Sequence, residues 1–232
     1  MKTPMSKEYV DYGKLGDLLQ GLERSTTELS SPGEGKTFIE HDAPGWCLDD
    51  YMGRFAKWAD MPTYDDQNQK RPCSMDALYI DDKGTLVLVE FKKDQIFEPK
   101  SGPRGPRFKQ ISGSPELRDD YRLWLCRKLS DTFVSLALRG VFPQFKDGKW
   151  RKSVKAYIVI CAAKNRWGST NPVARRIRGR NIDYPVPPGL PDYLFETVRI
   201  IDEKRFLMDI VPTFVAKFPT AKKACANQPT TS

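Results

Sequence analysis

The stretch Cys73–Lys93 reads CSMDALYIDDKGTLVLVEFKK and decides the fold of this chain. An apolar run that follows Asp76 leads into the turn sequence Asp81–Gly84, and a second apolar run ends at Glu90. Acidic residues followed by Lys-Gly are typical of a hairpin loop of about three to five residues, in which Gly84 adopts a positive φ. The stretch therefore predicts a β-hairpin with charged side chains at its open end.

The length of the turn sets the register of this hairpin. If Asp81 pairs with Thr85, counting back along the ladder places Asp76 directly opposite Glu90, whereas a slightly longer loop makes them diagonal neighbours. Side chains alternate along a strand, so Glu90 and Lys92 project from the same face. Two carboxylates held within about 5 Å repel each other, and a bound cation relieves that repulsion.

These three side chains together suggest a chemistry. A hard divalent cation such as Mg²⁺ or Mn²⁺ takes oxygen ligands, commonly one or two carboxylates with waters and phosphate oxygens. The carboxylates of Asp76 and Glu90 supply such ligands. An ammonium group at Lys92 can position a water or neutralise charge that builds up on a phosphate. The pattern predicts a metal-assisted phosphodiester hydrolase.

The order Asp76, thirteen residues, then Glu90-Phe91-Lys92 resembles the active-site signature of the PD-(D/E)XK nuclease superfamily. Met75 stands where the family name has proline. The resemblance implies Asp76 and Glu90 as metal ligands, the Phe91 carbonyl as a candidate third ligand, and Lys92 as the catalytic lysine. It implies an α/β fold class, with a restriction-endonuclease-like core in which helices flank a central mixed β-sheet.

The spacing of the motif is common in this chain, but its setting is not. An acidic residue two positions before a lysine occurs six times, at Glu34, Asp81, Glu90, Glu98, Asp147 and Asp202. Glu90 alone ends a five-residue apolar run that follows an Asp-bearing strand. The simpler interpretation is a surface hairpin whose Glu90 and Lys92 form a solvated pair worth about 0–1 kcal/mol.

A helix predicted upstream of the hairpin offers a further acidic ligand, which the family often adds. Trp46–Ala59 has Leu48, Met52, Phe55 and Trp58 at helical spacing. Asp50 is the candidate metal ligand, with Asp49 and Glu40 as alternatives. Aspartates near a helix start usually act as ordinary caps or dipole partners, so a structural role is the stronger interpretation of these residues.

The strongest helix pattern runs from Ser114 to Arg139, with Ser114 as the N-cap, Pro115 at the first helical position and Gly140 beyond the end. The family places a polar or basic residue on the helix after its motif. Lys128 is the candidate that faces the catalytic site. Arg118 and Arg122 are the alternatives on the same helix.

An uninterrupted apolar run, Val154–Ala162, predicts a central buried strand after this helix. The resulting order of helix, hairpin, helix and strand is the one that the nuclease core requires, although a third early strand is not identified. Tyr193–Ile201 and Phe206–Phe218 are apolar and compatible with either strand or helix.

Two basic segments without acidic residues are candidates for nucleic-acid binding. The first is Gly- and Pro-rich and follows the hairpin, and the second contains a tryptophan that suits base stacking. Solvated loops have the same composition. The candidate residues are Lys100, Arg104, Arg107 and Lys109 in the first segment, and Arg166, Trp167, Arg175, Arg176 and Arg178 in the second.

The remaining segments define the expected domain organisation. Residues 1–36 are predicted to be a peripheral N-terminal segment, with a weak helix in Tyr9–Leu22 and a loop over Ser25–Lys36. Residues 37–220 form the predicted nuclease-like domain. Residues 221–232 are predicted to be a disordered tail.

Composition limits the classes of function. The net charge of +8 and an isoelectric point near 9.2 agree with a polyanionic partner. No apolar run of about 18 residues predicts a membrane span, and the start of the chain lacks a signal-peptide pattern, so we expect a cytoplasmic protein without a membrane partner. His41 is the single histidine, which argues against a histidine-pair mechanism. Five scattered cysteines predict neither a zinc site nor a disulfide framework.

Three functional interpretations follow. The preferred one is a Mg²⁺-dependent nuclease that acts on DNA rather than RNA, with a homodimer left open. The first alternative is a non-catalytic nucleic-acid-binding protein on the same fold. The second is an interaction factor from a mobile element with an incidental hairpin. Metal binding by Asp76 and Glu90 distinguishes the first interpretation from the other two.

Overall fold

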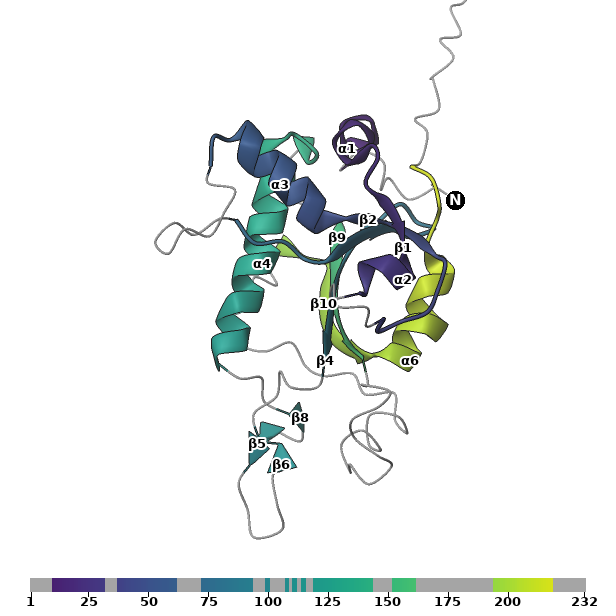
Figure 1. Ribbon diagram of the computed structural model, residues 1–232, viewed down its shortest axis with the longest axis vertical. Helices are drawn as coiled ribbons and strands as arrows, with labels where there is room; N and C mark the ends of the chain where they lie inside the picture. The colour runs from purple at the N-terminus through teal and green to yellow at the C-terminus, as the bar shows by residue number, and fades with distance from the viewer. Residues whose placement is uncertain are drawn as a thin grey trace, which may run out of the picture.

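The computed structural model describes residues 10–31, 37–61, 72–93, 99–100, 107–108, 110–111, 114–115, 119–143, 152–161 and 194–218. Within these ranges the chain forms an α/β fold with a six-stranded mixed sheet in the order β1-β2-β3-β4-β9-β10 (Figure 1). The coarse prediction, a central mixed sheet flanked by helices, is confirmed.

Four antiparallel strands from the first half of the chain are joined to two parallel ones. The neighbours from β1 to β4 pair antiparallel, while β9 pairs parallel to both β4 and β10. The bounds are β1 (Glu23–Ser25), β2 (Pro44–Cys47), β3 (Ala77–Ile80), β4 (Leu86–Lys93), β9 (Val154–Cys161) and β10 (Thr197–Asp202). Two short antiparallel pairs join β5 (Pro99–Lys100) to β6 (Arg107–Phe108) and β7 (Gln110–Ile111) to β8 (Ser114–Pro115).

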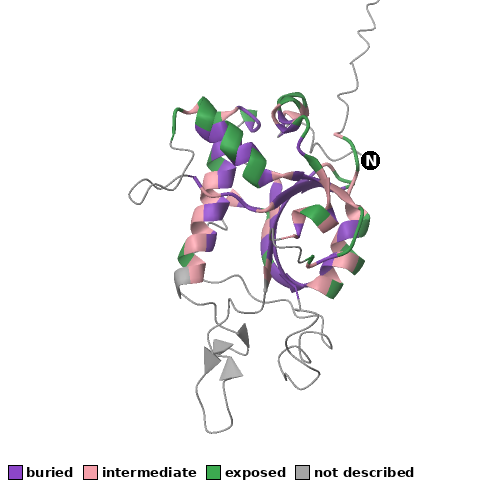
Figure 2. Cartoon of the chain, viewed as in Figure 1, coloured by how far each residue is buried: buried purple, intermediate pink, exposed green. Residues whose placement is uncertain are grey.

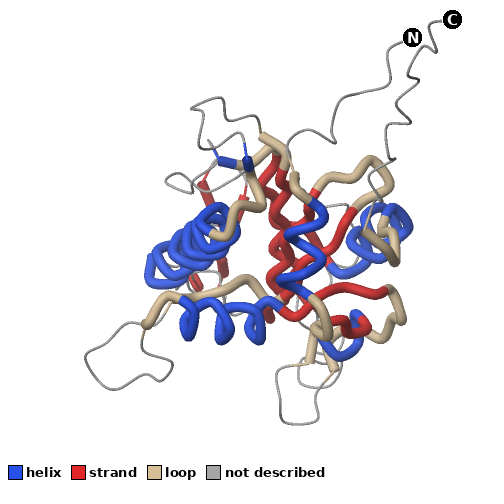
Figure 3. The backbone as a smooth tube through the Cα atoms, turned by 90° about the horizontal axis from the view of Figure 1, so that it is seen from above, coloured by secondary structure: helices blue, strands red, loops and turns tan. Residues whose placement is uncertain are grey.

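Helices lie on both faces of the sheet, as Figures 1 and 3 show from two directions. Core contacts place α1, α3 and α4 on one face, and the segment from α6 through η6 on the other. The helices are α1 (Tyr12–Leu19), α2 (Thr26–Leu29), α3 (Leu48–Trp58), α4 (Asp119–Leu138) and α6 (Glu203–Arg205), followed by the π-helical turn η5 (Phe206–Ile210) and the 3-10 turn η6 (Val211–Thr213). None of the helices in these ranges combines the length and apolar composition needed to cross a membrane.

The central strand β4 is buried on both faces, which explains its near-continuous apolar sequence. Leu86 and Leu88 pack into the core beneath α3 and α4, while Val87 and Val89 pack into the opposite core. Figure 2 shows the sheet as the most deeply buried part of the molecule. Glu90 continues the alternation of Leu86 and Leu88, so its carboxylate enters the α4 side of the sheet.

The hairpin has the predicted register. Ala77 pairs with Val89, which places Asp76 opposite Glu90. The Asp81 N–H donates to the Thr85 carbonyl at 3.0 Å, and Gly84 has a φ of +78°. The shorter of the two predicted loops is therefore the one formed.

Both helices that flank the hairpin begin later than predicted. Trp46 lies in β2 opposite Leu78, so helix α3 begins at Leu48. Strand pairing and burial of the indole in the core place Trp46 in the sheet and not in the helix that was predicted to begin there. Trp58 ends α3 at the edge of the predicted apolar face, where its ring packs 5.6 Å from that of Phe55 while 55% of its surface is exposed. Helix α4 begins at Asp119, and Ser114–Pro115 forms β8 in place of a cap and first turn.

The described part of residues 1–36 is not peripheral, in contrast to the prediction. Leu15 and Leu19 of α1 are fully buried in the core, and β1 extends the central sheet. The predicted loop after Ser25 begins with α2, where Ser25 and Glu28 form a capping box. These two strands, β1 and β2, are the early sheet elements that the sequence pattern did not identify.

The central strand predicted over Val154–Ala162 is confirmed as β9, between β4 and β10. The apolar sequences Tyr193–Ile201 and Phe206–Phe218, which were compatible with either strand or helix, contribute to both kinds of structure. Thr197–Asp202 forms the edge strand β10, and the chain then turns into the α6, η5 and η6 segment. The predicted tail, residues 221–232, lies outside the described residues.

Candidate active site

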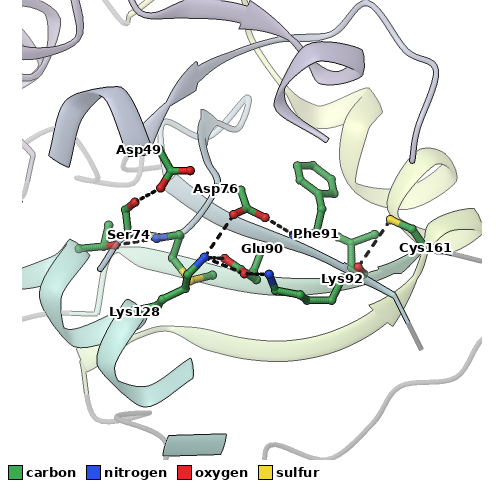
Figure 4. Close-up of polar contacts among 11 residues, drawn as sticks. Asp49, Ser74, Asp76, Glu90, Phe91, Lys92, Lys128 and Cys161 are labelled. Carbon is green, nitrogen blue, oxygen red and sulfur yellow. Dashed lines mark hydrogen bonds and ion pairs between the residues drawn. The ribbon is translucent and has the colours of Figure 1, made fainter. Parts of the chain in front are cut away.

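Four charged side chains converge at the open end of the hairpin, beneath helix α4 (Figure 4). Lys128 Nζ lies 2.8 and 2.9 Å from the two oxygens of Glu90 and 3.3 Å from Asp76 Oδ1. Lys92 Nζ lies 2.8 Å from Glu90 Oε1. The structure therefore brings together Asp76, Glu90, Lys92 and Lys128, which are the four residues predicted to act in catalysis.

Asp76 is fixed by the strand that carries its partner. The Phe91 N–H donates to Asp76 Oδ2 at 2.7 Å, and the Asp76 N–H donates to the Val89 carbonyl at 3.0 Å. These bonds leave Asp76 Oδ1 directed toward Lys128. The hairpin thus sets the orientation of the Asp76 carboxylate.

Helix α4 is anchored to the residues just before Asp76. Thr132 Oγ1 accepts the Met75 N–H at 2.9 Å, and Asp131 Oδ2 accepts the Cys73 N–H at 2.9 Å. Thr132 is fully buried. Since Lys128 lies one turn earlier on α4, these bonds fix the helix that carries its ammonium group relative to the carboxylates.

Trp124 belongs to the site and was not predicted. Lys128 Nζ lies 4.2 Å and Lys92 Nζ 4.4 Å from the centroid of the Trp124 ring. Both distances are in the range of cation–π attraction, so one indole stabilises two neighbouring ammonium groups. Trp124 precedes Lys128 by one helical turn, and this i,i+4 spacing is the signal that identifies it from sequence.

Tyr121 is a second residue of this helix face that was not predicted. Its hydroxyl is buried without a hydrogen-bond partner among the described residues, and its ring packs 5.4 Å from that of Trp124. Burial, reinforced by the charges of Glu90 and Asp76, raises the pKa of Tyr121 well above its usual range. The hydroxyl is therefore a neutral hydrogen-bond donor near two carboxylates.

The carboxylate of Glu90 is fully buried. Its burial, followed by the charge of Asp76, raises the pKa of Glu90 to about 8, while Lys128 and Lys92 act in the opposite direction. Burial lowers the pKa of Lys128, but the charges of Asp76 and Glu90 outweigh it and raise that pKa. Lys128 therefore stays protonated at neutral pH.

The upstream acidic residues differ from the prediction. Asp50 is not brought to the site, because its side chain is 53% exposed and lies 3.6 Å from Arg24. Asp49 lies nearer and accepts a hydrogen bond from Ser74 Oγ. Asp50 lies on the exposed side of α3, because its place in the helical turn separates it from the buried face that contains Met52 and Phe55.

The residues predicted to bind nucleic acid have no described side chains. Lys100 and Arg107 occupy paired positions of β5 and β6, where the backbone alone is described. The others lie outside the described residues: Arg104, Lys109, Arg166, Trp167, Arg175, Arg176 and Arg178. Their proposed role stays a prediction.

The carboxylates of Asp76 and Glu90 suit a hard cation that takes only one or two of its ligands from the protein. Two carboxylates from adjacent strands converge on one cation, here the Lys128 ammonium. Within the described ranges, no group of three or more His, Cys, Asp or Glu side chains is arranged to hold a metal ion. Mg²⁺ is commonly bound through one or two carboxylates plus waters and phosphates, so Asp76 and Glu90 fit this ion. The predicted role of the Phe91 carbonyl stays a prediction, whereas its N–H is occupied by Asp76.

Comparisons with family models, with curated proteins and with solved structures give no match to this chain.

Proposed function

We propose that this protein is a metal-dependent nuclease of the PD-(D/E)XK type. The observation that carries the proposal is the pairing of Asp76 opposite Glu90, with both carboxylates directed at a single cation and Lys92 ion-paired with Glu90. A surface hairpin explains this arrangement poorly, because Glu90 is fully buried and the cluster is covered by α4.

The order of elements supports a restriction-endonuclease-like core. Helix α3 precedes the β3–β4 hairpin, α4 follows it, and β9 then pairs parallel to β4. The charged cluster lies at the end of β4, beside its parallel neighbour. A functional site at such a strand end is common in α/β proteins.

In this mechanism Asp76 and Glu90 are the residues that would hold a divalent cation. When bound, that cation supplies Lewis-acid chemistry, which polarises a phosphate oxygen and acidifies a water. Lys92 is 27% exposed and held between Glu90 and the Trp124 ring, so its ammonium is positioned to orient the attacking water or to stabilise negative charge on the phosphate. The Phe91 N–H keeps Asp76 in place throughout.

DNA is the proposed substrate class. The chain carries a net charge of +8, and its two basic segments contain the arginines, lysines and tryptophan that suit phosphate contacts and base stacking.

The test is cleavage of supercoiled plasmid and of single-stranded DNA with Mg²⁺ or Mn²⁺, compared with EDTA. Wild type is compared with Lys92→Ala and Asp76→Asn, and with Lys14→Ala as a control that removes an exposed lysine of α1 paired with Asp11. Metal-dependent cleavage that is lost in the first two variants and kept in the control supports the proposal. Cleavage that survives Asp76→Asn contradicts it.

A second candidate function is nucleic-acid binding without catalysis. The observation that favours it is Lys128, whose ammonium already neutralises the two carboxylates in place of a metal. A gel shift with DNA, in the absence of any cleavage and with no effect of metal, supports this alternative and excludes the nuclease.

A further inference from the structure

We propose that Lys128 is a tethered cation that competes with the divalent metal for Asp76 and Glu90, and thereby sets the metal affinity of the site. The inference rests on the proposed function. It assigns to Lys128 a role in metal occupancy rather than in the chemical step.

The ammonium of Lys128 occupies the position of a shared cation. It contacts both oxygens of Glu90 and the Oδ1 atom of Asp76, at 2.8, 2.9 and 3.3 Å. The other oxygen of Asp76 accepts the Phe91 N–H. Lys128 therefore contacts every carboxylate oxygen of the pair except the one that the backbone already binds.

This contact is built into the fold. Helix α4 is joined to the segment before Asp76 by the hydrogen bonds of Thr132 and Asp131, and the Lys128 side chain is only 9% exposed. The face of Trp124 covers the ammonium at 4.2 Å. A lysine that faced water would have none of these restraints.

A divalent ion and the Lys128 ammonium cannot both occupy the position between Asp76 and Glu90. Metal–oxygen distances for Mg²⁺ are about 2.1 Å, shorter than the contacts of the Lys128 ammonium, so both cations would lie within a few ångströms of each other inside the protein. Like charges at such a separation repel strongly where water is excluded. Binding of a divalent ion therefore requires Lys128 to withdraw.

Lys92 differs from Lys128 in this respect. Its ammonium contacts Glu90 Oε1, and its side chain is 27% exposed, three times as much as that of Lys128. Lys92 thus lies at the edge of the carboxylate pair and Lys128 lies between the carboxylates. The competition is assigned to Lys128 alone.

The experiment is titration of the metal-free protein with Mn²⁺ by calorimetry at neutral pH, for wild type, Lys128→Met and Arg127→Met. Arg127 is the adjacent residue on α4 and pairs with Asp131, so its variant removes the same charge without freeing the carboxylates. We expect Lys128→Met to bind Mn²⁺ more tightly by roughly tenfold or more, and Arg127→Met to resemble wild type.

Thermal unfolding provides a second measurement on the same proteins. Without metal, Lys128→Met leaves the buried Glu90 and the partly buried Asp76 without their shared cation, so its melting temperature falls below that of wild type, and saturating Mn²⁺ restores it. If Lys128→Met does not fold without metal, Lys128→Gln replaces it, since glutamine keeps a donor but removes the charge.

The failure of this inference is distinct from failure of the proposed function. Equal or weaker Mn²⁺ affinity in the charge-removing variant overturns the competition, while metal-dependent cleavage by wild type leaves the nuclease proposal intact. Tighter binding that persists after Asp76→Asn is added to Lys128→Met also overturns it, because the metal would then lie elsewhere. Absence of Mn²⁺ binding in every variant overturns both proposals.

Discussion

Asp81 and Lys155 form an ion pair of 2.8 Å at the closed end of the hairpin whose open end carries Asp76 and Glu90. Asp81 is buried, and its other oxygen accepts the N–H groups of Lys83 and Thr85 at 3.0 and 2.7 Å. One carboxylate thus shapes the turn and joins it to β9. Because the turn sets the register, Asp81 also controls whether Asp76 lies opposite Glu90.

We predict that Asp81→Ala lowers the free energy of unfolding by about 3 kcal/mol, because it leaves the Lys155 ammonium and two turn N–H groups without their acceptor. Asp82→Ala, an exposed neighbour in the same turn, should change it by about 0.5 kcal/mol or less. Urea denaturation of both variants measures the difference. Similar losses in the two variants would show that Asp81 has no special role.

The hairpin could be predicted because its determinants are local. Turn composition and strand alternation left two registers for Asp76 and Glu90, directly opposite or diagonal, and the same alternation placed Lys92 on the face of Glu90. The anchoring of α4 by Thr132 and Asp131 could not be read in this way, since it joins positions more than fifty residues apart through backbone N–H groups that leave no pattern in the sequence.

The incorrect predictions for Asp50 and Trp46 also have physical causes. Asp50 was assigned to the site from its place on the upstream helix, but helical phase directs it toward Arg24. Trp46 was predicted to begin the upstream helix, yet pairing with β3 makes it part of a strand. Tertiary contacts overrode local preference in both cases. Trp124 and Tyr121 could have been found from Lys128, because they precede it on the same helix face.

The stability of the protein should depend on pH through Glu90. Its pKa of about 8 in the folded protein lies above its ordinary value of 4.5. The folded state therefore retains a proton that the unfolded state releases. This contribution is fully present below pH of about 4.5 and is lost as the pH rises through about 8, with an upper limit on the order of 5 kcal/mol.

We predict that Glu90→Gln matches wild type in unfolding free energy near pH 4.5 and becomes the more stable protein as the pH rises toward 9. Glutamine mimics the protonated acid and cannot ionise, so the variant does not lose this contribution. Urea denaturation at intervals across this range measures the difference. A difference that does not change with pH would contradict the raised pKa of Glu90.

Removal of the buried Tyr121 hydroxyl should not lower the free energy of unfolding. Tyr121→Phe removes a polar group that has no partner within the described residues, so the free energy of unfolding should stay constant or rise by about 1 kcal/mol. Tyr79→Phe is the matched control. Its hydroxyl lies 3.1 Å from Thr26 Oγ1 in the opposite core, and its loss should lower stability by about 1 kcal/mol. Thermal and urea unfolding distinguish the two, and a clear loss for Tyr121→Phe would reveal a partner that stabilises its hydroxyl.

Trp124 should affect cleavage through the position of the Lys92 ammonium. Its ring lies 4.4 Å from Lys92 Nζ, and a cation–π contact of about 1 kcal/mol corresponds to about fivefold in rate. We predict that Trp124→Leu lowers kcat by about this factor at saturating metal, and that Trp124→Phe, which keeps an aromatic face, recovers part of the loss. A purely structural role would instead lower stability without selective rescue by phenylalanine.

Trp58→Leu is the control for removing a tryptophan. The Trp58 ring packs 4.6 Å from the Arg139 guanidinium at the ends of α3 and α4, and over half of its surface is exposed. This pair makes the same kind of cation–π contact without contacting the carboxylates, so kcat should remain at the wild-type value. If the two leucine variants lose the same fraction of activity, the effect of Trp124 comes from general destabilisation and not from its contact with Lys92.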